Sequence, residues 1–262
     1  MRGQILITGL LAMLMGAAVA DDHLRSAEDI RQCSRQNFPQ ETAVQAFNLR
    51  SFDALGSERN LIGKLSWQRN KEGLSDINIC FSGPPKFRGS CYLVEEKAEQ
   101  DDIHVYLPAL QRVKRVLGSA TSESLLGTDI SYEDLKQLHG IAAGGSVARQ
   151  EDGRLGERAV YVIEGRPAAS SESPYTRVLS YVDKTSCMPL QVDFYTVGDV
   201  HRKRLSVAHE TLEQEDGRWW VRNLVIEDMR DSTRTEIEFG KAEYDAKIAS
   251  RVFSKRSFYL LN

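Results

Sequence analysis

The sequence lacks the short motifs that mark the common hydrolases and nucleotide-binding proteins. None of GxSxG, HExxH, SxxK or the P-loop pattern occurs in its 262 residues, so no activated serine, zinc-peptidase site or phosphate-binding loop is predicted. The histidines never fall at the spacing of metal ligands; they are His23, His104, His139, His201 and His209. The sequence therefore predicts no catalytic residue, no metal site and no cofactor.

An excess of charge of one sign is also missing. The 34 Lys and Arg residues nearly balance the 37 Asp and Glu residues, and the formal net charge is −3. The basic residues do not alternate with aromatic residues along any one element, as they do on nucleic-acid-binding surfaces. The sequence therefore predicts no nucleic-acid partner.

Long apolar runs are absent except at the N-terminus. The first 20 residues, MRGQILITGLLAMLMGAAVA, combine one positive charge, an apolar run and an Ala-Val-Ala end. This order is typical of a cleaved secretory signal peptide, and no cysteine follows it for lipid attachment. We expect 1–20 to be removed and 21–262, which is 262 − 20 = 242 residues, to form a single exported domain.

Cysteines are few and never occur as CxxC, which argues against a zinc or thioredoxin-type site. In an oxidising compartment Cys33, Cys80, Cys91 and Cys187 are expected to pair, and four cysteines allow three connectivities. Cys80 and Cys91 flank FSGPPKFRGS, whose Gly-Pro-Pro is typical of a turn between two strands. The hypothesis is therefore Cys80 with Cys91 and Cys33 with Cys187, with the other connectivities left open.

Apolar residues alternate with polar ones through most of the chain. After a short helix that Ser26 and Asp29 cap, this period of two predicts about eleven strands with short turns between them. The alternating segments are NLIGKLSWQR, SDINICFS, SCYLVEE and DIHVYLP in the first half, and ERAVYVIEG, YTRVLSYVD, PLQVDFYTVG, RKRLSVAHETLE, RWWVRNLVIED and TRTEIEFGKAEY in the second. The fold class is therefore mainly β (α+β), an antiparallel sheet that curls or closes because so many strands rarely stay flat. The aromatic residues expected on its inner face are Trp67, Phe81, Tyr106, Tyr181, Phe194 and Trp220.

The strand pattern is interrupted in 117–156. This stretch contains LLGTDISYEDL, where apolar residues surround a turn signal, and Ser131 with Asp134 resembles a capping box for a helix over 132–139. We expect the insertion to cover the open side of the sheet, with a mobile lid over an apolar cavity. The lid residues would be Leu125, Leu126, Ile130, Tyr132 and Leu135.

The same stretch holds the densest acidic group, Asp129, Glu133 and Asp134. Carboxylates so close together can do acid–base chemistry. Helix capping and the helix dipole explain Glu133 and Asp134 more simply.

Two basic clusters allow two interpretations each. Arg112, Lys114 and Arg115 precede the insertion, and Arg202, Lys203 and Arg204 lie in a later strand. Either cluster could meet anionic headgroups or an acidic partner, or simply protect an exposed strand edge. We favour the solvated edge for 202–204 and leave 112–115 open.

Four segments, YLPALQRVKRV, LLGTDISYEDL, YVDKTSCMPLQVDFYTVGD and FSKRSF, resemble the bacterial outer-membrane lipoprotein-sorting proteins, the broad LolA/LolB-like group. The resemblance runs in order from about residue 60 to the end. It implies a half-open curled antiparallel β-barrel plugged by short helices, an apolar interior that takes acyl chains, and the periplasm of a Gram-negative bacterium. It also implies Gly127 at the mouth and Arg112 and Arg115 at the rim. Members of the group often accompany RND-type exporters.

Three functions compete on these observations. The first is a non-catalytic periplasmic carrier of lipid or lipoprotein acyl chains, with transient docking to a membrane surface or partner. The second is an accessory subunit of an RND-type lipid or hydrophobe exporter, docking through 112–135. The third, a hydrolase using Asp129 or His104, ranks last because no activated nucleophile can be assembled.

Overall fold

The computed structural model describes residues 24–97, 101–134, 145–168, 173–215 and 217–260. Within these residues the chain is mainly β-structure. Fifteen strands form one antiparallel sheet and β13 and β14 form a separate hairpin. The expected signal peptide, 1–20, lies outside the described residues.

The first six strands form a meander in which each strand pairs with the next. Pairing runs without a crossover from β1 at the middle of the sheet to β6 at one edge. The strands are β1 (Thr42–Phe52), β2 (Glu58–Arg69), β3 (Ser75–Gly83), β4 (Cys91–Glu95), β5 (Asp102–Leu107) and β6 (Arg112–Val116).

The remaining strands complete the sheet and the hairpin. The order continues from β1 through β16, β15, β12, β11, β10 and β9 to β7 at the other edge. Their bounds are β7 (Ser146–Arg149), β8 (Gly153–Leu155), β9 (Arg158–Arg166), β10 (Arg177–Asp183), β11 (Pro189–Thr196), β12 (Val200–Val207), β13 (Leu212–Glu215), β14 (Arg218–Val221), β15 (Asn223–Asp228), β16 (Thr233–Phe239) and β17 (Glu243–Tyr244).

The helical elements are short. The α-helix α1 (Ala27–Arg35) begins with the predicted capping box, since the Ser26 side chain accepts from the Asp29 N–H and Asp29 accepts from the Ser26 N–H. The 3₁₀ helices are η1 (Pro108–Leu110), η2 (Gly118–Ser122), η3 (Leu125–Gly127), η4 (His209–Thr211) and η5 (Ser250–Phe253). In the described residues, no helix combines the length and the apolar character that crossing a membrane requires.

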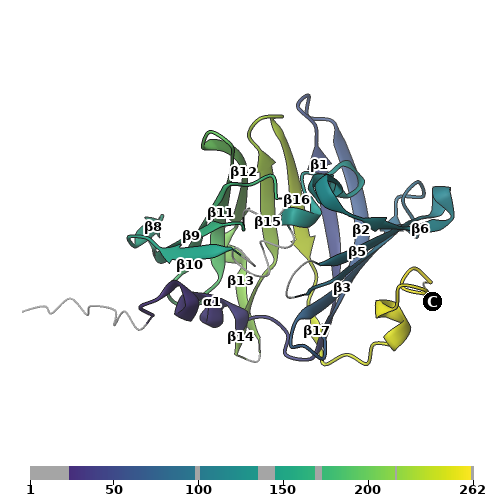
Figure 1. The fold of residues 1–262 in the computed structure, drawn as a ribbon, viewed down its shortest axis with the longest axis horizontal. Helices are drawn as coiled ribbons and strands as arrows, with labels where there is room; N and C mark the ends of the chain where they lie inside the picture. The colour runs from purple at the N-terminus through teal and green to yellow at the C-terminus, as the bar shows by residue number, and fades with distance from the viewer. Residues whose placement is uncertain (1–23, 98–100, 135–144, 169–172, 216, 261–262) are drawn as a thin grey trace, which may run out of the picture.

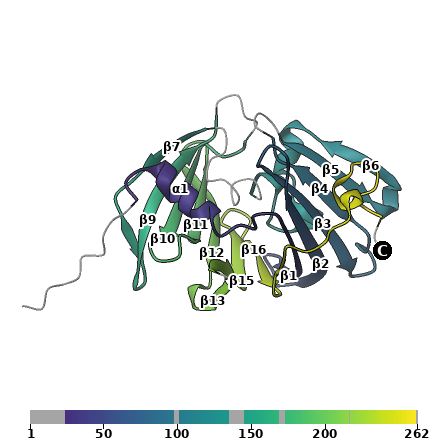
Figure 2. The ribbon, with the colours of Figure 1, turned by 90° about the horizontal axis from the view of Figure 1, so that it is seen from below.

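The sheet bends around a concave face (Figures 1 and 2). Strands β1 and β16 join its two halves over six residue pairs, from Phe47 opposite Phe239 to Phe52 opposite Arg234. In the described part of the chain the strand pairing shifts at three bulges, one of them between Ile62 and Gly63. Bulges bend a strand and increase its twist, which favours a curved sheet over a flat one.

Gly63 is required at its bulge. A Cβ there would lie 2.5 Å from Cζ of Phe47 and 2.7 Å from the carbonyl oxygen of Cys80. The absence of a side chain lets the Phe47 ring pack directly on β2, so this bend depends on glycine.

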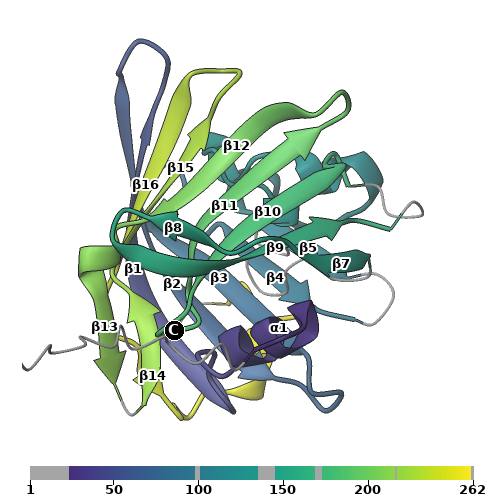
Figure 3. The ribbon, with the colours of Figure 1, turned by 90° about the vertical axis from the view of Figure 1, so that its left-hand side faces the viewer.

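The outer, convex face of the sheet carries a covering segment on each of its two halves. On one side lies α1 (Figure 3), and its Ile30 packs with Tyr161, Ile163 and Val182. On the other, Phe253 and Phe258 of the C-terminal segment pack with Leu93. Each of these two clusters contains a disulfide, Cys33–Cys187 in the first and Cys80–Cys91 in the second. These are the pairs expected from the sequence.

The architecture agrees with the predicted mainly antiparallel β-fold, but the strand count differs. Three strands, β1, β7 and β8, were not predicted. Three of the expected strands each divide in two: RKRLSVAHETLE spans β12 and the start of β13, RWWVRNLVIED spans β14 and β15, and TRTEIEFGKAEY spans β16 and β17. The predicted insertion 117–156 includes β7 and β8, which both pair with β9. Within the described residues, edge strands β6 and β7 do not pair with each other, so the sheet is not a closed cylinder there.

Candidate functional site: the cover on the concave face

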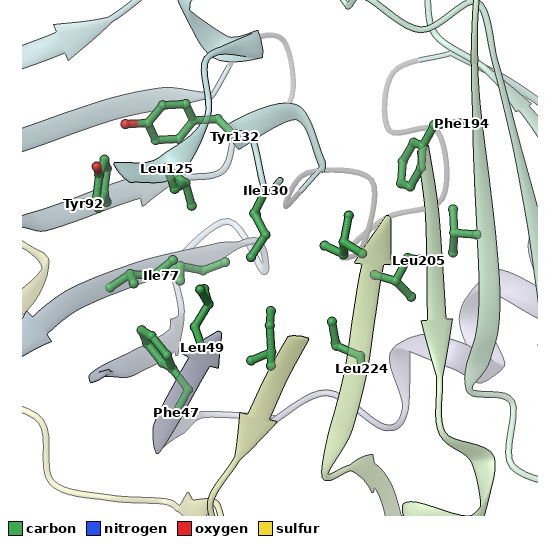
Figure 4. Packing of buried hydrophobic residues seen from close by; sticks show 14 of the residues in the cluster. Phe47, Leu49, Ile77, Tyr92, Leu125, Ile130, Tyr132, Phe194, Leu205 and Leu224 are labelled. Carbon is green, nitrogen blue, oxygen red and sulfur yellow. The ribbon is translucent and has the colours of Figure 1, made fainter. Parts of the chain in front are cut away.

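The concave face of the sheet is apolar. Side chains from β1, β3 and β4 on one half and from β11, β12 and β15 on the other point toward a common interior (Figure 4). The labelled residues of the sheet are Phe47, Leu49, Ile77, Tyr92, Phe194, Leu205 and Leu224. A concave apolar face of this extent buries its side chains only if another segment or a ligand covers it.

Residues 124–134, called the cover, lie over this face. Leu125, Ile130 and Tyr132 are 4 to 6 % exposed and belong to the same hydrophobic cluster as the sheet residues. The apolar side chains around the LLGTD turn therefore point into the protein, which is where the sequence pattern places them.

A line of aromatic rings connects the cover to the centre of the sheet. Ring centroids are 5.6 Å apart between Tyr132 and Tyr92, 6.1 Å between Tyr92 and Phe81, and 5.6 Å between Phe81 and Phe47. The two pairs that involve Phe81 are edge-to-face and the Tyr132–Tyr92 pair is tilted; edge-to-face contacts add to the energy of apolar burial. Burial raises the pKa of Tyr92 to about 12, because the phenolate would be poorly solvated among these rings.

The cover folds back on itself through a tight turn. The N–H of Leu125 donates to the Ile130 carbonyl at 2.7 Å, and the Thr128 hydroxyl donates to the Leu125 carbonyl at 2.8 Å. Leu126 (φ 50°) and Gly127 (φ 74°) adopt left-handed backbone conformations. Such a conformation is rare for leucine and easy only for glycine.

Arg59 of β2 holds the tip of this turn. Its guanidinium donates to the Gly127 carbonyl and lies over the Phe87 ring, 5.9 Å from the centroid. A Cβ at Gly127 would come within 3.2 Å of both terminal nitrogens of Arg59. The glycine therefore permits both the turn and the close approach of the arginine.

Asp129 anchors the cover to the middle of the sheet. Its carboxylate accepts from the hydroxyls of Thr233 and Thr235 on β16, the latter at 2.6 Å. Its N–H donates back to the Thr235 hydroxyl at 2.9 Å. Asp129 is 8 % exposed and Thr235 fully buried, so these bonds are shielded from water and costly to lose.

A second anchor forms at the other end of the cover. Asp134 caps the helical turn as predicted, accepting from the Ser131 N–H at 2.7 Å. It also accepts from the Tyr175 hydroxyl at 2.5 Å and from the Lys203 ammonium at 2.7 Å. Lys203 donates further to the carbonyl of Asp129 at 2.7 Å. One lysine of the sheet thus bonds to both ends of 129–134.

Burial and the adjacent Asp134 carboxylate both raise the pKa of Tyr175. The hydrogen bond to Asp134 uses the phenol proton, so both effects disfavour the phenolate in the folded protein.

Comparison with known proteins places the chain in a family. A family model described as "-like: Uncharacterized protein" matches residues 73–259, well over half of the sequence. The chain belongs to this family. No curated protein matches it by sequence.

Solved structures give the fold its context. A DUF1329 family protein from Desulfovibrio piger has a TM-score of 0.80 and 26 % identity, covering 86 % of this chain and 95 % of its own. A putative outer membrane lipoprotein-sorting protein domain from Vibrio parahaemolyticus has a TM-score of 0.80, 21 % identity and coverages of 88 % and 97 %. A LolA superfamily protein from Nitrosomonas europaea has a TM-score of 0.71, 16 % identity and coverages of 89 % and 99 %. The resemblance to lipoprotein-sorting proteins is thereby confirmed at the level of the fold, which is LolA-like.

The LolA-like sheet brings together only part of the predicted cavity set. Trp67, Phe81 and Phe194 belong to the concave-face cluster, and Tyr181 packs at its margin. Leu126 of the cover is partly buried against the same cluster. Leu135 lies outside the described residues.

Two predicted aromatics lie elsewhere. Tyr106 points to the outer side of β5, where its ring stacks on Tyr259 at 4.0 Å. Trp220 belongs to the separate β13–β14 hairpin, with the Arg222 guanidinium 5.4 Å from its ring centroid. Alternation identified both as inward-facing residues, but it cannot tell which side of a curved sheet is concave.

The predicted rim residues lie on edge strand β6 but on different faces. Arg112 and Lys114 alternate in phase with Val116, whose side chain belongs to the concave-face cluster. Arg115 points to the other face, where it donates to Asp102 at 2.6 Å. The three basic residues of β6 therefore do not form one patch, because Arg115 lies on the opposite face of the strand from Arg112 and Lys114.

Several residues of the site were not identified from the sequence. Lys203 was assigned to a solvated face, yet it is 8 % exposed and in phase with Leu205 and Val207. That phase is the signal that could have placed it inward. Thr233 and Thr235 share the phase of Ile237 in the same way. Arg59 shares the phase of Leu61 on β2, whereas Tyr175 carried no such signal.

The arrangement offers binding rather than an evident reaction centre. Asp129 is bound by two threonines on the concave side, while His104 shares the opposite face of β5 with Tyr106. Among the described residues, no three His, Cys, Asp or Glu side chains gather where a metal ion could be held. A pocket of about 270 Å³ opens beside the tip of the cover; its lining includes Ser51, Asp53, Arg59, Gly127, Asp129 and Thr233.

Proposed function

We propose that the protein is a non-catalytic periplasmic carrier that binds the acyl chains of a lipid or lipoprotein on its concave face. The observation that carries the proposal is the cover: an apolar segment lies on an apolar concave sheet and is held there by a few polar contacts. Two disulfides fit an oxidising compartment.

Acyl chains would take the place of the cover's own side chains. Displacing Leu125, Ile130 and Tyr132 exposes apolar surface of the sheet to water. This exposure costs about 25 cal/mol of free energy per Å². Hydrocarbon of similar area restores that contact. Because the cover and the ligand compete for one surface, binding stays moderate enough for release to an acceptor.

Native mass spectrometry of protein purified gently from periplasm, followed by organic extraction, tests this proposal. The expected result is an added mass that resolves into phospholipid or acylated peptide. Leu224→Trp places a larger side chain in the interior and should reduce the fraction of protein that carries the added mass. Ile62→Trp, at an exposed position, should leave that fraction unchanged. A bare protein mass that persists after incubation with total membrane lipid would contradict the carrier function.

A second candidate, an accessory subunit of an RND-type envelope exporter, is favoured by the edge strand β6. Leu110 and Leu117 flank it and are each 50 % exposed, and Arg112 and Lys114 are also exposed. Unpaired edges with exposed apolar residues are suited to strand addition by a partner.

A photo-crosslinking residue at Lys114, with Lys64 as the control position, distinguishes this candidate. Crosslinks from position 114 to an inner-membrane transporter, together with a lipid-free protein mass, would favour the accessory role. Lipid in the protein and no crosslink above the control would leave the carrier function.

A further inference from the structure

Where the cover meets the sheet, the acidic side chains belong to the cover and the basic side chain belongs to the sheet. The cover contributes three acids, Asp129, Glu133 and Asp134, all at most 8 % exposed. The sheet contributes Lys203, which is buried to the same degree and bonds to Asp134 at 2.7 Å. Negative charge therefore belongs to the segment that a ligand must displace, and positive charge to the surface that the ligand would contact.

The surroundings of Lys203 on the sheet are mostly apolar. Its neighbours in register are Phe194 on β11 and Asp228 on β15, and Leu205 shares its face on β12. Asp228 is already engaged, since one carboxylate oxygen accepts from Arg202 and from the N–H groups of Arg230 and Asp231. The counter-charge that bonds directly to Lys203 comes from the cover.

Displacing the cover changes the two sides unequally. The acids move into water, where their charges are solvated. Lys203 stays on the concave face, where an unpaired ammonium is strongly unfavourable. A neutral hydrocarbon chain covers the apolar surface and leaves this cost in place, whereas a ligand that brings its own anion removes it.

We infer that Lys203 and Tyr175 form a receiving site for the anionic group, a carboxylate or a phosphate, of an amphiphile whose chain occupies the concave face. The ammonium and the phenol, which now donate to Asp134, would donate to the ligand anion instead. The inference rests on the proposed carrier function and specifies further that the carried ligand is anionic. A ligand shifts such an equilibrium only by its difference in affinity for the two states, and the anion supplies that difference.

A pair of fluorescent probes that differ only in charge tests the inference. The probes are 11-(dansylamino)undecanoic acid and its methyl ester, titrated into the full mature protein. Hydrogen bonds to charged groups correspond to about tenfold or more in affinity, so the acid should bind at least about tenfold more tightly than the ester. Competition by dodecanoate and by dodecyl phosphate separates a fatty acid from a phosphate headgroup as the source of the anion.

Substitutions assign the preference to residues. Lys203→Met should reduce the acid-to-ester ratio to about threefold or less, the share that Tyr175 supplies, and Lys64→Met, at an exposed site on β2, should leave the ratio unchanged. Asp134→Asn weakens the attachment of the cover, so both probes should bind more tightly while the ratio persists. Tyr175→Phe should lower the ratio by roughly threefold and serves as the test if Lys203→Met does not fold.

The outcomes separate the two proposals. Failure of wild type to bind either probe contradicts the carrier function itself. Equal binding of acid and ester by wild type leaves the carrier function in place and overturns the inference. An acid-to-ester ratio that Lys203→Met leaves unchanged, or that Tyr175→Phe leaves unchanged where the first variant is unfolded, overturns the inference as well.

Discussion

The hydroxyl of Thr235, on β16 at the centre of the sheet, bonds twice to Asp129 of the cover. It accepts from the Asp129 N–H at 2.9 Å and donates to the Asp129 carboxylate at 2.6 Å. The two residues are 106 positions apart in the sequence. A single buried side chain thus fixes both the backbone and the side chain of the segment that closes the concave face.

Thr235→Val should release the cover without changing the shape of the core. The valine fills the same volume but leaves the Asp129 N–H without its acceptor and removes one donor from a buried carboxylate. The expected loss is about 1–3 kcal/mol in the free energy of unfolding, measured by urea denaturation. Amide exchange in 125–134 should accelerate.

Thr196→Val is the control for that substitution, because the Thr196 hydroxyl makes one exposed bond to the Val200 carbonyl. Its cost should stay within about 0.5 kcal/mol. Equal losses from the two variants would mean that Thr235 does not anchor the cover.

Gly127→Ala should destabilise the turn at the tip of the cover. The residue has a φ of 74°, and a Cβ would crowd the Arg59 guanidinium at 3.1 Å. Gly56→Ala is a matched control because Gly56 has a φ of 82° and nothing within 4 Å of the Cβ position. Alanine at positive φ costs about 1 kcal/mol or more.

The difference between these two glycine variants, measured by urea unfolding, reports the Arg59 contact separately from backbone strain. Gly127→Ala should cost more than Gly56→Ala, and Arg59→Ala should reduce the gap. A Gly127→Ala variant as stable as Gly56→Ala would show that the arginine moves aside freely.

Local signals in the sequence predicted local structure. Both capping boxes, at Ser26 and at Ser131, form with the acids that the spacing indicated. Alternation predicted most strands, but it did not indicate β1, where Gln45 interrupts the inward phase of Ala43 and Phe47. Strands β7 and β8 are four and three residues long, too short for a period to be recognised.

The candidate site could be predicted only in part, because its contacts join distant segments. The apolar residues of the cover were identified from their position around a turn. Their partners Lys203, Thr235 and Tyr175 come from three other parts of the chain, and only the folded sheet brings them together. The alternation of Lys203 with Leu205 and Val207 indicates an inward position, but the run of three basic residues suggested a solvated face instead.

Removal of each disulfide should destabilise the protein to a different degree. In the loop-entropy description, the cost rises with the length of the closed loop. Cys33–Cys187 spans 154 positions and Cys80–Cys91 spans 11. Double alanine variants should therefore lose about 5 and about 3 kcal/mol respectively, measured by urea unfolding. A larger loss from the short loop would indicate that packing in the outer clusters dominates over chain entropy.

The change of stability with pH should depend on Lys255 of the C-terminal segment, which pairs with Asp102. Burial alone would raise the pKa of Asp102, but hydrogen bonds from Lys255 and Arg115 outweigh it and lower this pKa to about 2. A carboxyl whose pKa is lowered in the folded state contributes stability above its unfolded pKa, near 4, and loses it as the pH falls toward 2. Lys255→Met should raise the pKa of Asp102 and reduce stability at neutral pH. Wild type loses this same contribution when Asp102 is protonated in acid. The free energies of unfolding of wild type and Lys255→Met should therefore become equal below about pH 2.

Urea unfolding at intervals from pH 7 to pH 2, with Lys64→Met as the control, checks this expectation. The control should run parallel to wild type because Lys64 is exposed and distant from the Asp102 cluster in strand order. A constant gap between Lys255→Met and wild type at every pH would mean that the lysine acts through the packing of its methylene chain rather than through the Asp102 carboxylate.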